Sequence, residues 1–161
     1  MINKISAGLL MYRTKNSQLE IFLAHPGGPY WENKDAGSWG IPKGEVEGHE
    51  AFFAAAKREF FEETGIQPQG TFLELGTVTL TTGKTVYAWA FENDWDNPRP
   101  ITSNLFELEW PPNSGTKEFF PEIDQAVFFP EPIARQKISP AQAEFIDRLI
   151  NLLQQEKPLH S

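Results

Sequence analysis

The segment from residue 44 to residue 66 reads GEVEGHEAFFAAAKREFFEETGI, and its composition decides how this part of the chain folds. Residues from about His49 to Thr64 include several alanines and no glycine or proline, and Gly65 follows where a helix-ending residue is expected. Phe53 and Phe60 are spaced so that they share one side of such a helix. The segment therefore predicts a helix that packs an aromatic face on the core and ends at Gly65.

Three glutamates near the end of this helix lie on one face, because Glu59, Glu62 and Glu63 are spaced at i, i+3 and i+4. Like charges at that spacing repel one another, and the C-terminal end of a helix favours cations instead. A divalent cation such as Mg²⁺ or Mn²⁺ would compensate, since both ions prefer oxygen ligands. A solvated acidic face is the alternative interpretation of the same three residues.

The rest of the chain predicts a sheet and a second long helix. Apolar and β-branched runs predict strands at 6–12, 19–24, 72–81, 85–91, 106–110 and 126–129. Loops are expected at 25–40, with a short extended piece at 38–42, and at 94–102. A closing helix is expected to start with Ser139 as N-cap and Pro140 at its first position. Residues 1–161 are thus expected to form a single α+β domain with a mixed sheet between helices.

Composition excludes several classes of protein. The 161 residues include no cysteine, which excludes disulfide scaffolds, thiolate metal sites and cysteine nucleophiles. The net charge of −8 argues against a nucleic-acid coat or an anionic membrane surface as the main partner. Half of that charge falls between residues 44 and 65, which hold six acidic and two basic side chains. No targeting segment and no apolar run of about 20 residues is evident, so we expect a cytoplasmic protein.

The spacing within the opening segment resembles the Nudix box, G-x5-E-x7-R-E-U-x-E-E-x-G-U, where U is a bulky aliphatic residue. Every fixed position of that pattern is matched, by Gly44, Glu50, Arg58, Glu59, Glu62, Glu63 and Gly65. Phe60 is larger than the aliphatic residue usual at its position, whereas Ile66 fits the second U. The resemblance implies the Nudix fold, an α/β/α sandwich, and hydrolysis of a nucleoside diphosphate linked to another moiety.

The resemblance also implies which residues would bind metal. Glu59 and Glu63 would be the main ligands of Mg²⁺ or Mn²⁺, with Glu62 as a further ligand or the partner of one. The region of Gly44 would offer a backbone carbonyl. The metals would polarise the phosphoryl oxygens and lower the pKa of the attacking water.

Further roles are implied less specifically. Glu50 and Arg58 would pair, hold the loop against the helix and steer Glu59. A carboxylate outside the box often serves relatives as general base or additional ligand, and Glu122 lies before the last expected strand, where relatives often carry one. A surface acid in a loop is the alternative interpretation of Glu122.

Two further residues are candidates for substrate binding. Lys43, in Pro42-Lys43-Gly44, is similar to a lysine in Nudix enzymes that act on dinucleoside polyphosphates and diphosphoinositol phosphates, where it could neutralise a polyphosphate chain. Trp39 could stack on a nucleobase, as could Tyr30 and Trp31, although aromatics in loops are more often structural. His25 and His160 stand in no motif, and we expect neither to be catalytic.

The function expected from these observations is that of a Mg²⁺-dependent pyrophosphohydrolase. Its substrate would be a small-molecule nucleotide, and Lys43 slightly favours a dinucleoside polyphosphate. Nucleoside triphosphates, deoxynucleoside triphosphates, ADP-ribose and nucleotide sugars are alternatives. A Nudix-fold nucleotide sensor without catalysis is a further alternative, disfavoured because such modules typically lose glutamates that this chain retains.

Overall fold

The computed structural model describes residues 4–94 and 103–156. Most of the loop expected at 94–102, as well as His160, lies outside these residues. In chain order the elements are β1 (Ile5–Lys15), β2 (Gln18–Pro26), β3 (Lys43–Glu45), α1 (Phe52–Thr64), β4 (Phe72–Thr79), β5 (Thr85–Glu92), β6 (Leu105–Glu109), β7 (Lys117–Pro121), β8 (Ile123–Pro130), α2 (Glu131–Lys137), a 3₁₀ turn (Pro140–Gln142) and α3 (Ala143–Glu156).

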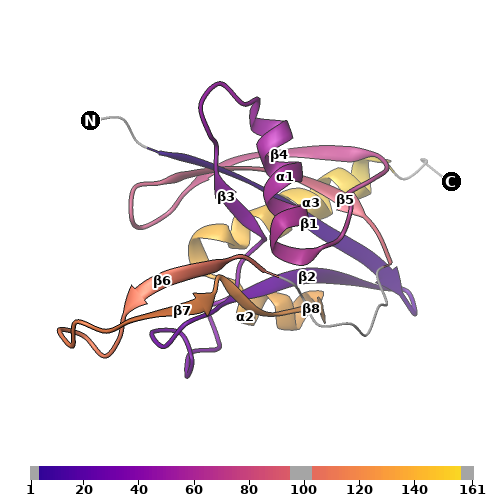
Figure 1. Ribbon diagram of the computed structural model, residues 1–161. Coiled ribbons are helices and arrows are strands. Elements are labelled where there is room, and N and C mark those ends of the chain that lie inside the picture. Colours follow the sequence, from indigo (N-terminus) through magenta and orange to yellow (C-terminus); the bar gives the residue numbers. More distant parts are fainter. Residues whose placement is uncertain (1–3, 95–102, 157–161) are drawn as a thin grey trace, which may run out of the picture.

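The main sheet has six strands, in the order β4-β5-β1-β2-β8 with β3 beside β1. Strand β1 runs parallel to β5 and antiparallel to β2 and β3, so the sheet is mixed, as expected. Helix α1 covers one face of the sheet, and α2 and α3 cover the other (Figure 1). Strands β6 and β7 form a separate two-stranded ribbon that extends away from the main sheet (Figure 1). The expected α/β/α layering is confirmed.

Strand β1 lies at the centre because both of its faces are apolar. Leu9 and Met11 point toward α1 and join the same core cluster as Phe60. Leu10 points the other way and joins a second cluster with Phe145 of α3. Alternate side chains of a strand face opposite sides, so a continuous apolar run is what a strand buried between two layers requires.

Helix α1 ends where the sequence predicts and begins later than predicted. Gly65 has φ 75° and its N–H donates to the carbonyl oxygen of Phe61 at 2.8 Å, which is a glycine C-terminal cap. The first helical residue is Phe52, because Glu50 belongs to a turn in which its N–H donates to the Glu47 oxygen at 2.9 Å. The expectation of a helix from His49 is wrong by about one turn.

Three elements escape prediction: β3, β7 and α2. The two strands are regular because of tertiary pairing rather than local pattern. Residues 117–121 form β7 through pairing with β6, although they include a lysine, a glutamate and a proline. Helix α2 has only seven residues, too few to show a helical period. Ser139 and Pro140 do precede the last helix, but through a 3₁₀ turn, and the Ser139 side chain makes no capping hydrogen bond.

Candidate active site

Arg58 organises the loop before α1 and the carboxylates on the helix. Its Nε and one terminal nitrogen donate to the two carboxylate oxygens of Glu50 at 2.8 and 3.0 Å. Its other terminal nitrogen donates to Glu59 at 2.9 Å and to Glu62 at 3.1 Å. Such a two-pronged arginine–carboxylate pair fixes orientation as well as charge. The structure thus brings together the pair implied by the motif. The hydrogen bond from Arg58 lowers the pKa of Glu50.

Glycine at position 44 leaves room for the carboxylate of Glu59. A Cβ at Gly44 would lie 2.0 Å from the carboxylate carbon and from one carboxylate oxygen of Glu59. Strand β3 presents this backbone to the helix because Gly44 pairs with Ala7 of β1. The close approach sets the Glu59 carboxylate directly against the main chain, and burial raises the pKa of Glu59 despite the hydrogen bond from Arg58.

Glu63 is the most deeply buried of the three helix glutamates and is 6% exposed. The backbone N–H of Lys43 donates to its carboxylate, whereas Oε2 is buried without a partner. Among the residues described, Ser139 Oγ is the other buried side-chain oxygen without a hydrogen-bond partner. Burial, reinforced by the charges of Glu59 and Glu122, raises the pKa of Glu63 to about 9. A lone buried carboxylate oxygen of this kind is costly unless a proton or a cation accompanies it.

Glu122 lies in the single-residue gap between β7 and β8, and the backbone on both sides of it is held. Its backbone N–H donates to the backbone oxygen of Asn104 at 2.8 Å, and its backbone oxygen accepts from the N–H of Gly27 at 3.0 Å. Burial and the nearby charge of Glu62 raise the pKa of Glu122. The charge of Glu122 in turn raises the pKa of Glu63, so the fold brings this carboxylate close to those on α1.

A pocket of about 520 Å³ opens beside these carboxylates and contains Lys43, Glu63 and Glu122 in its wall. Burial lowers the pKa of the Lys43 ammonium, while the charges of Glu63 and Glu59 oppose that shift. The lining also includes aromatic, aliphatic and uncharged polar residues, among them Trp31, Trp39, Leu80, Thr81, Thr82, Ser139 and Gln142. The pocket therefore combines charged side chains with aromatic, aliphatic and uncharged polar ones.

Trp39 is 5% exposed and lines this pocket with part of its ring. Its indole N–H donates to Asp35 at 2.8 Å, and its ring contacts those of His25 and Phe129 edge-on. Tyr30, by contrast, is 56% exposed and packs edge-on against Trp110, away from the residues that line the pocket.

The residues present fit a hard divalent cation. Glu59, Glu62 and Glu63 supply carboxylate oxygens, and the buried Oε2 of Glu63 lacks a hydrogen-bond donor. Within residues 4–94 and 103–156, no three such side chains are close enough together to hold an ion as they stand. Arg58 donates hydrogen bonds to both Glu59 and Glu62, so these two carboxylates are paired with the arginine in the metal-free protein.

Several pocket residues are not marked by any sequence motif. Gln142 accepts a hydrogen bond from the Ile41 N–H at 3.0 Å, across a separation of 101 residues. Thr81 and Thr82 come from the β4–β5 turn, and Ser139 from the start of the 3₁₀ turn. No local spacing joins these segments, because only the tertiary fold brings them to the wall of one pocket.

Comparison with known proteins identifies the family. The model of the NUDIX domain matches residues 3–149, which is most of the chain, and the chain therefore belongs to the Nudix family. No curated protein sequence matches it. Across the described residues, no helix is long and apolar enough to cross a membrane.

Solved structures show the same fold. The chain is similar to the NUDIX domain of Shewanella oneidensis NrtR in complex with ADP ribose, with TM-score 0.67 and 13% identity over 95% of this chain and 90% of that one. It is also similar to a Caenorhabditis elegans Ap4A hydrolase, with TM-score 0.62 and 19% identity over 94% and 98% of the two chains. A MutT protein from Methanosarcina mazei aligns with TM-score 0.59 and 19% identity over 96% of each chain. At these identities the similarity establishes the fold.

Proposed function

We propose that this chain is a Mg²⁺-dependent pyrophosphohydrolase that cleaves a nucleoside diphosphate linked to another moiety. The observation that supports this most strongly is the buried Oε2 of Glu63, which has no hydrogen-bond partner. Glu63 lines a pocket together with Glu122, and the charges of Glu59 and Glu122 help to raise its pKa. A chain that only needed a stable helix would gain by replacing Glu63 with an apolar residue. Retaining it makes sense where a cation binds.

The carboxylates of Glu59, Glu62 and Glu63 and a backbone carbonyl near Gly44 would hold the metal. When bound, the ion supplies positive charge to the phosphate oxygens and lowers the pKa of water. Arg58 contributes by orienting Glu59 through its hydrogen bond, with Glu50 holding the arginine in place.

Glu122 is the group we assign as general base. In this step the water oxygen forms a bond to phosphorus, the water proton passes to the Glu122 carboxylate, and the P–O bond of the anhydride breaks with its electron pair on the departing phosphate. The raised pKa of Glu122 suits this task, because a base works best when its pKa approaches the working pH. Lys43, which lines the same pocket, would place its ammonium group beside the polyphosphate.

We favour a dinucleoside polyphosphate as substrate. Lys43 supplies a cation for a chain of phosphates, and the 520 Å³ pocket with Trp31 and Trp39 in its wall has room for a nucleoside. The similarity to an Ap4A hydrolase is consistent with this choice. The similarity to an NrtR domain complexed with ADP ribose keeps ADP-ribose as the second candidate, either as substrate or as a ligand sensed without turnover.

A substrate panel tests the proposal. The purified chain with Mg²⁺ is incubated with diadenosine tetraphosphate, ADP-ribose, a nucleotide sugar and a deoxynucleoside triphosphate, and the products are resolved by ion-exchange chromatography. Glu63→Gln is the matched control, because it preserves volume and removes the charge. We expect the wild type alone to cleave diadenosine tetraphosphate. Binding of ADP-ribose with no turnover of any compound would contradict the enzymatic function and support a sensor.

A further inference from the structure

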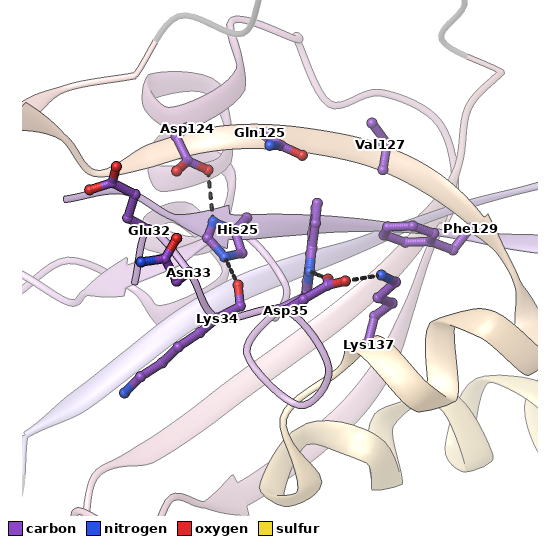
Figure 2. Close-up of a pocket in the computed structure, with 11 residues that line it drawn as sticks. His25, Glu32, Asn33, Lys34, Asp35, Asp124, Gln125, Val127, Phe129 and Lys137 are labelled. Atoms are coloured by element: carbon purple, nitrogen blue, oxygen red, sulfur yellow. Dashed lines mark hydrogen bonds and ion pairs between the residues drawn. The ribbon is translucent and has the colours of Figure 1, made fainter. Parts of the chain in front are cut away.

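His25 ties two segments together in a second pocket, of about 440 Å³, which it lines together with Asp124 and Lys34 (Figure 2). Its side chain is 6% exposed. Nδ1 lies 2.8 Å from a carboxylate oxygen of Asp124, and Nε2 donates to the backbone oxygen of Lys34 at 2.6 Å. One buried imidazole therefore links the loop after β2 to strand β8.

Asp124 is the residue at which β8 departs from regular pairing with β2. His25 pairs with Gln125, but the next residue, Pro26, pairs with Ile123, so Asp124 is an extra residue without a partner across the sheet. Such a residue is a β-bulge, which bends a strand and changes the direction of the side chains beyond it. Here the carboxylate of the bulged residue is the one that contacts His25.

The bulge determines which of the side chains before it point toward the core. Ile123 and Ala126 are 7% and 8% exposed and belong to the same core cluster, although residues three apart in a regular strand face opposite sides. Without the extra residue, the chain preceding β8 would be out of phase with β2. Glu122 directly precedes Ile123. Its backbone oxygen accepts a hydrogen bond at 3.0 Å from the N–H of Gly27, the residue that follows β2.

We propose that His25 is a positioning residue that acts through Asp124: by holding the bulge, it directs Glu122 toward the carboxylates of α1. This inference rests on the proposed function, in which Glu122 accepts the proton of the attacking water. His25 itself is buried and both of its ring nitrogens are occupied by Asp124 and Lys34, so neither nitrogen is free to bind substrate.

A double-mutant cycle tests whether the effect passes through Glu122. Asp124→Ala removes the contact to His25 at a side chain that is 34% exposed, and Asp124→Asn keeps an oxygen that can accept the same hydrogen bond. We expect Asp124→Ala to lower kcat at least tenfold with KM within twofold, and Asp124→Asn to recover kcat to within threefold of wild type. In a Glu122→Gln background, Asp124→Ala should change kcat less than twofold. Equal losses in both backgrounds, or no recovery with asparagine, would overturn the inference.

Glu32→Gln is the matched control, because it removes a carboxylate from the wall of the same pocket and leaves the pair of His25 and Asp124 in place. It should leave kcat within twofold of wild type. A loss of kcat as large as that of Asp124→Ala would show that the pocket is merely sensitive to charge and would overturn the inference.

Amide hydrogen exchange provides a readout that needs no turnover. If His25 and Asp124 hold the bulge, Asp124→Ala should speed the exchange of the Gly27 and Glu122 amides at least tenfold, while the Ala55 amide, bonded to the Ala51 oxygen within α1, exchanges as in wild type. Unchanged exchange at Gly27 and Glu122 would overturn the inference even in an active enzyme. Faster exchange together with full activity of Glu122→Gln would instead refute the assignment of Glu122 as base and leave the structural role of His25 standing.

Discussion

Replacing Glu63 by glutamine should change how the stability of the metal-free protein depends on pH. Burial, together with the charges of Glu59 and Glu122, raises the folded-state pKa of Glu63 to about 9 from an ordinary value of 4.5. Between these two values the folded state holds a proton that the unfolded chain releases. The stability linked to that proton is therefore fully present below about pH 4.5 and is lost as the pH rises toward 9.

The size of the effect follows from the linkage between protons and folding. One proton held only by the folded state lowers the free energy of unfolding by about 1.4 kcal/mol for each pH unit of increase. From pH 6 to pH 8, the wild type should thus lose about 3 kcal/mol from Glu63 alone. Glutamine carries no titrating proton and has nearly the same shape, so the variant should lack this contribution. The raised pKa values of Glu59 and Glu122 act in the same direction in both proteins.

Urea unfolding followed by tryptophan fluorescence, in the presence of EDTA, measures the effect. We expect the two proteins to differ little in stability at pH 5.5 and the variant to be the more stable one at pH 8, by about 3 kcal/mol. Parallel stability curves for wild type and Glu63→Gln across this range would refute the reasoning, because they would mean that Glu63 ionises normally in the folded protein. Addition of Mg²⁺ should reverse the order at pH 8, since only the wild type retains the buried ligand.

Three further substitutions test other parts of the account. Gly44→Ala places a Cβ 2.0 Å from the Glu59 carboxylate, so it should displace Glu59 and lower Mg²⁺-dependent kcat by about 100-fold, as steady-state kinetics would measure. Glu50→Gln weakens the pair with Arg58 but leaves the ligands in place; its kcat should fall less than that of Glu63→Gln, and the reverse order would contradict the supporting role of Glu50. Gln142→Leu leaves the buried N–H of Ile41 without an acceptor and should reduce the free energy of unfolding in urea by about 1–3 kcal/mol, whereas an unchanged midpoint would show that another acceptor replaces it.

The helix and its carboxylates are predictable from sequence because the relevant distances are local. Residues three and four positions apart share a helix face, so the grouping of Glu59, Glu62 and Glu63 follows from their spacing once α1 forms. The pairing of Glu50 with Arg58 also lies within eight residues of sequence. The structure adds how deeply each carboxylate is buried, because tertiary packing leaves Glu63 only 6% exposed, whereas the side chain of Glu62 is 37% exposed.

The pocket and the bulge are not predictable in the same way. The hydrogen bond from the Ile41 N–H to Gln142 joins residues 101 apart, and the contact of His25 with Asp124 joins residues 99 apart. Both depend on the order of the strands, which local patterns do not determine. His25 stands in no motif, so its burial between two acceptors is visible only when β2 and β8 are paired.

The prediction of Glu122 depended on family resemblance rather than on a pattern of its own. Its chain neighbours Phe119 and Phe120 belong to β7, whose regularity comes from pairing with β6 rather than from alternation. The structure places Glu122 beside the helix carboxylates, which supports the proposed role. Glu122→Gln tests whether it accepts the proton of the attacking water.

The central claim is that Glu63 and its neighbours form a metal-dependent site for phosphoric anhydride hydrolysis. The most direct measurement is the initial rate of diadenosine tetraphosphate cleavage at pH 8 by wild type and Glu63→Gln, each with Mg²⁺ and with excess EDTA. We expect turnover only for wild type with Mg²⁺, with the folded state of the variant verified by its urea unfolding. Turnover by Glu63→Gln at a rate near that of wild type, or turnover by wild type in EDTA, would contradict it.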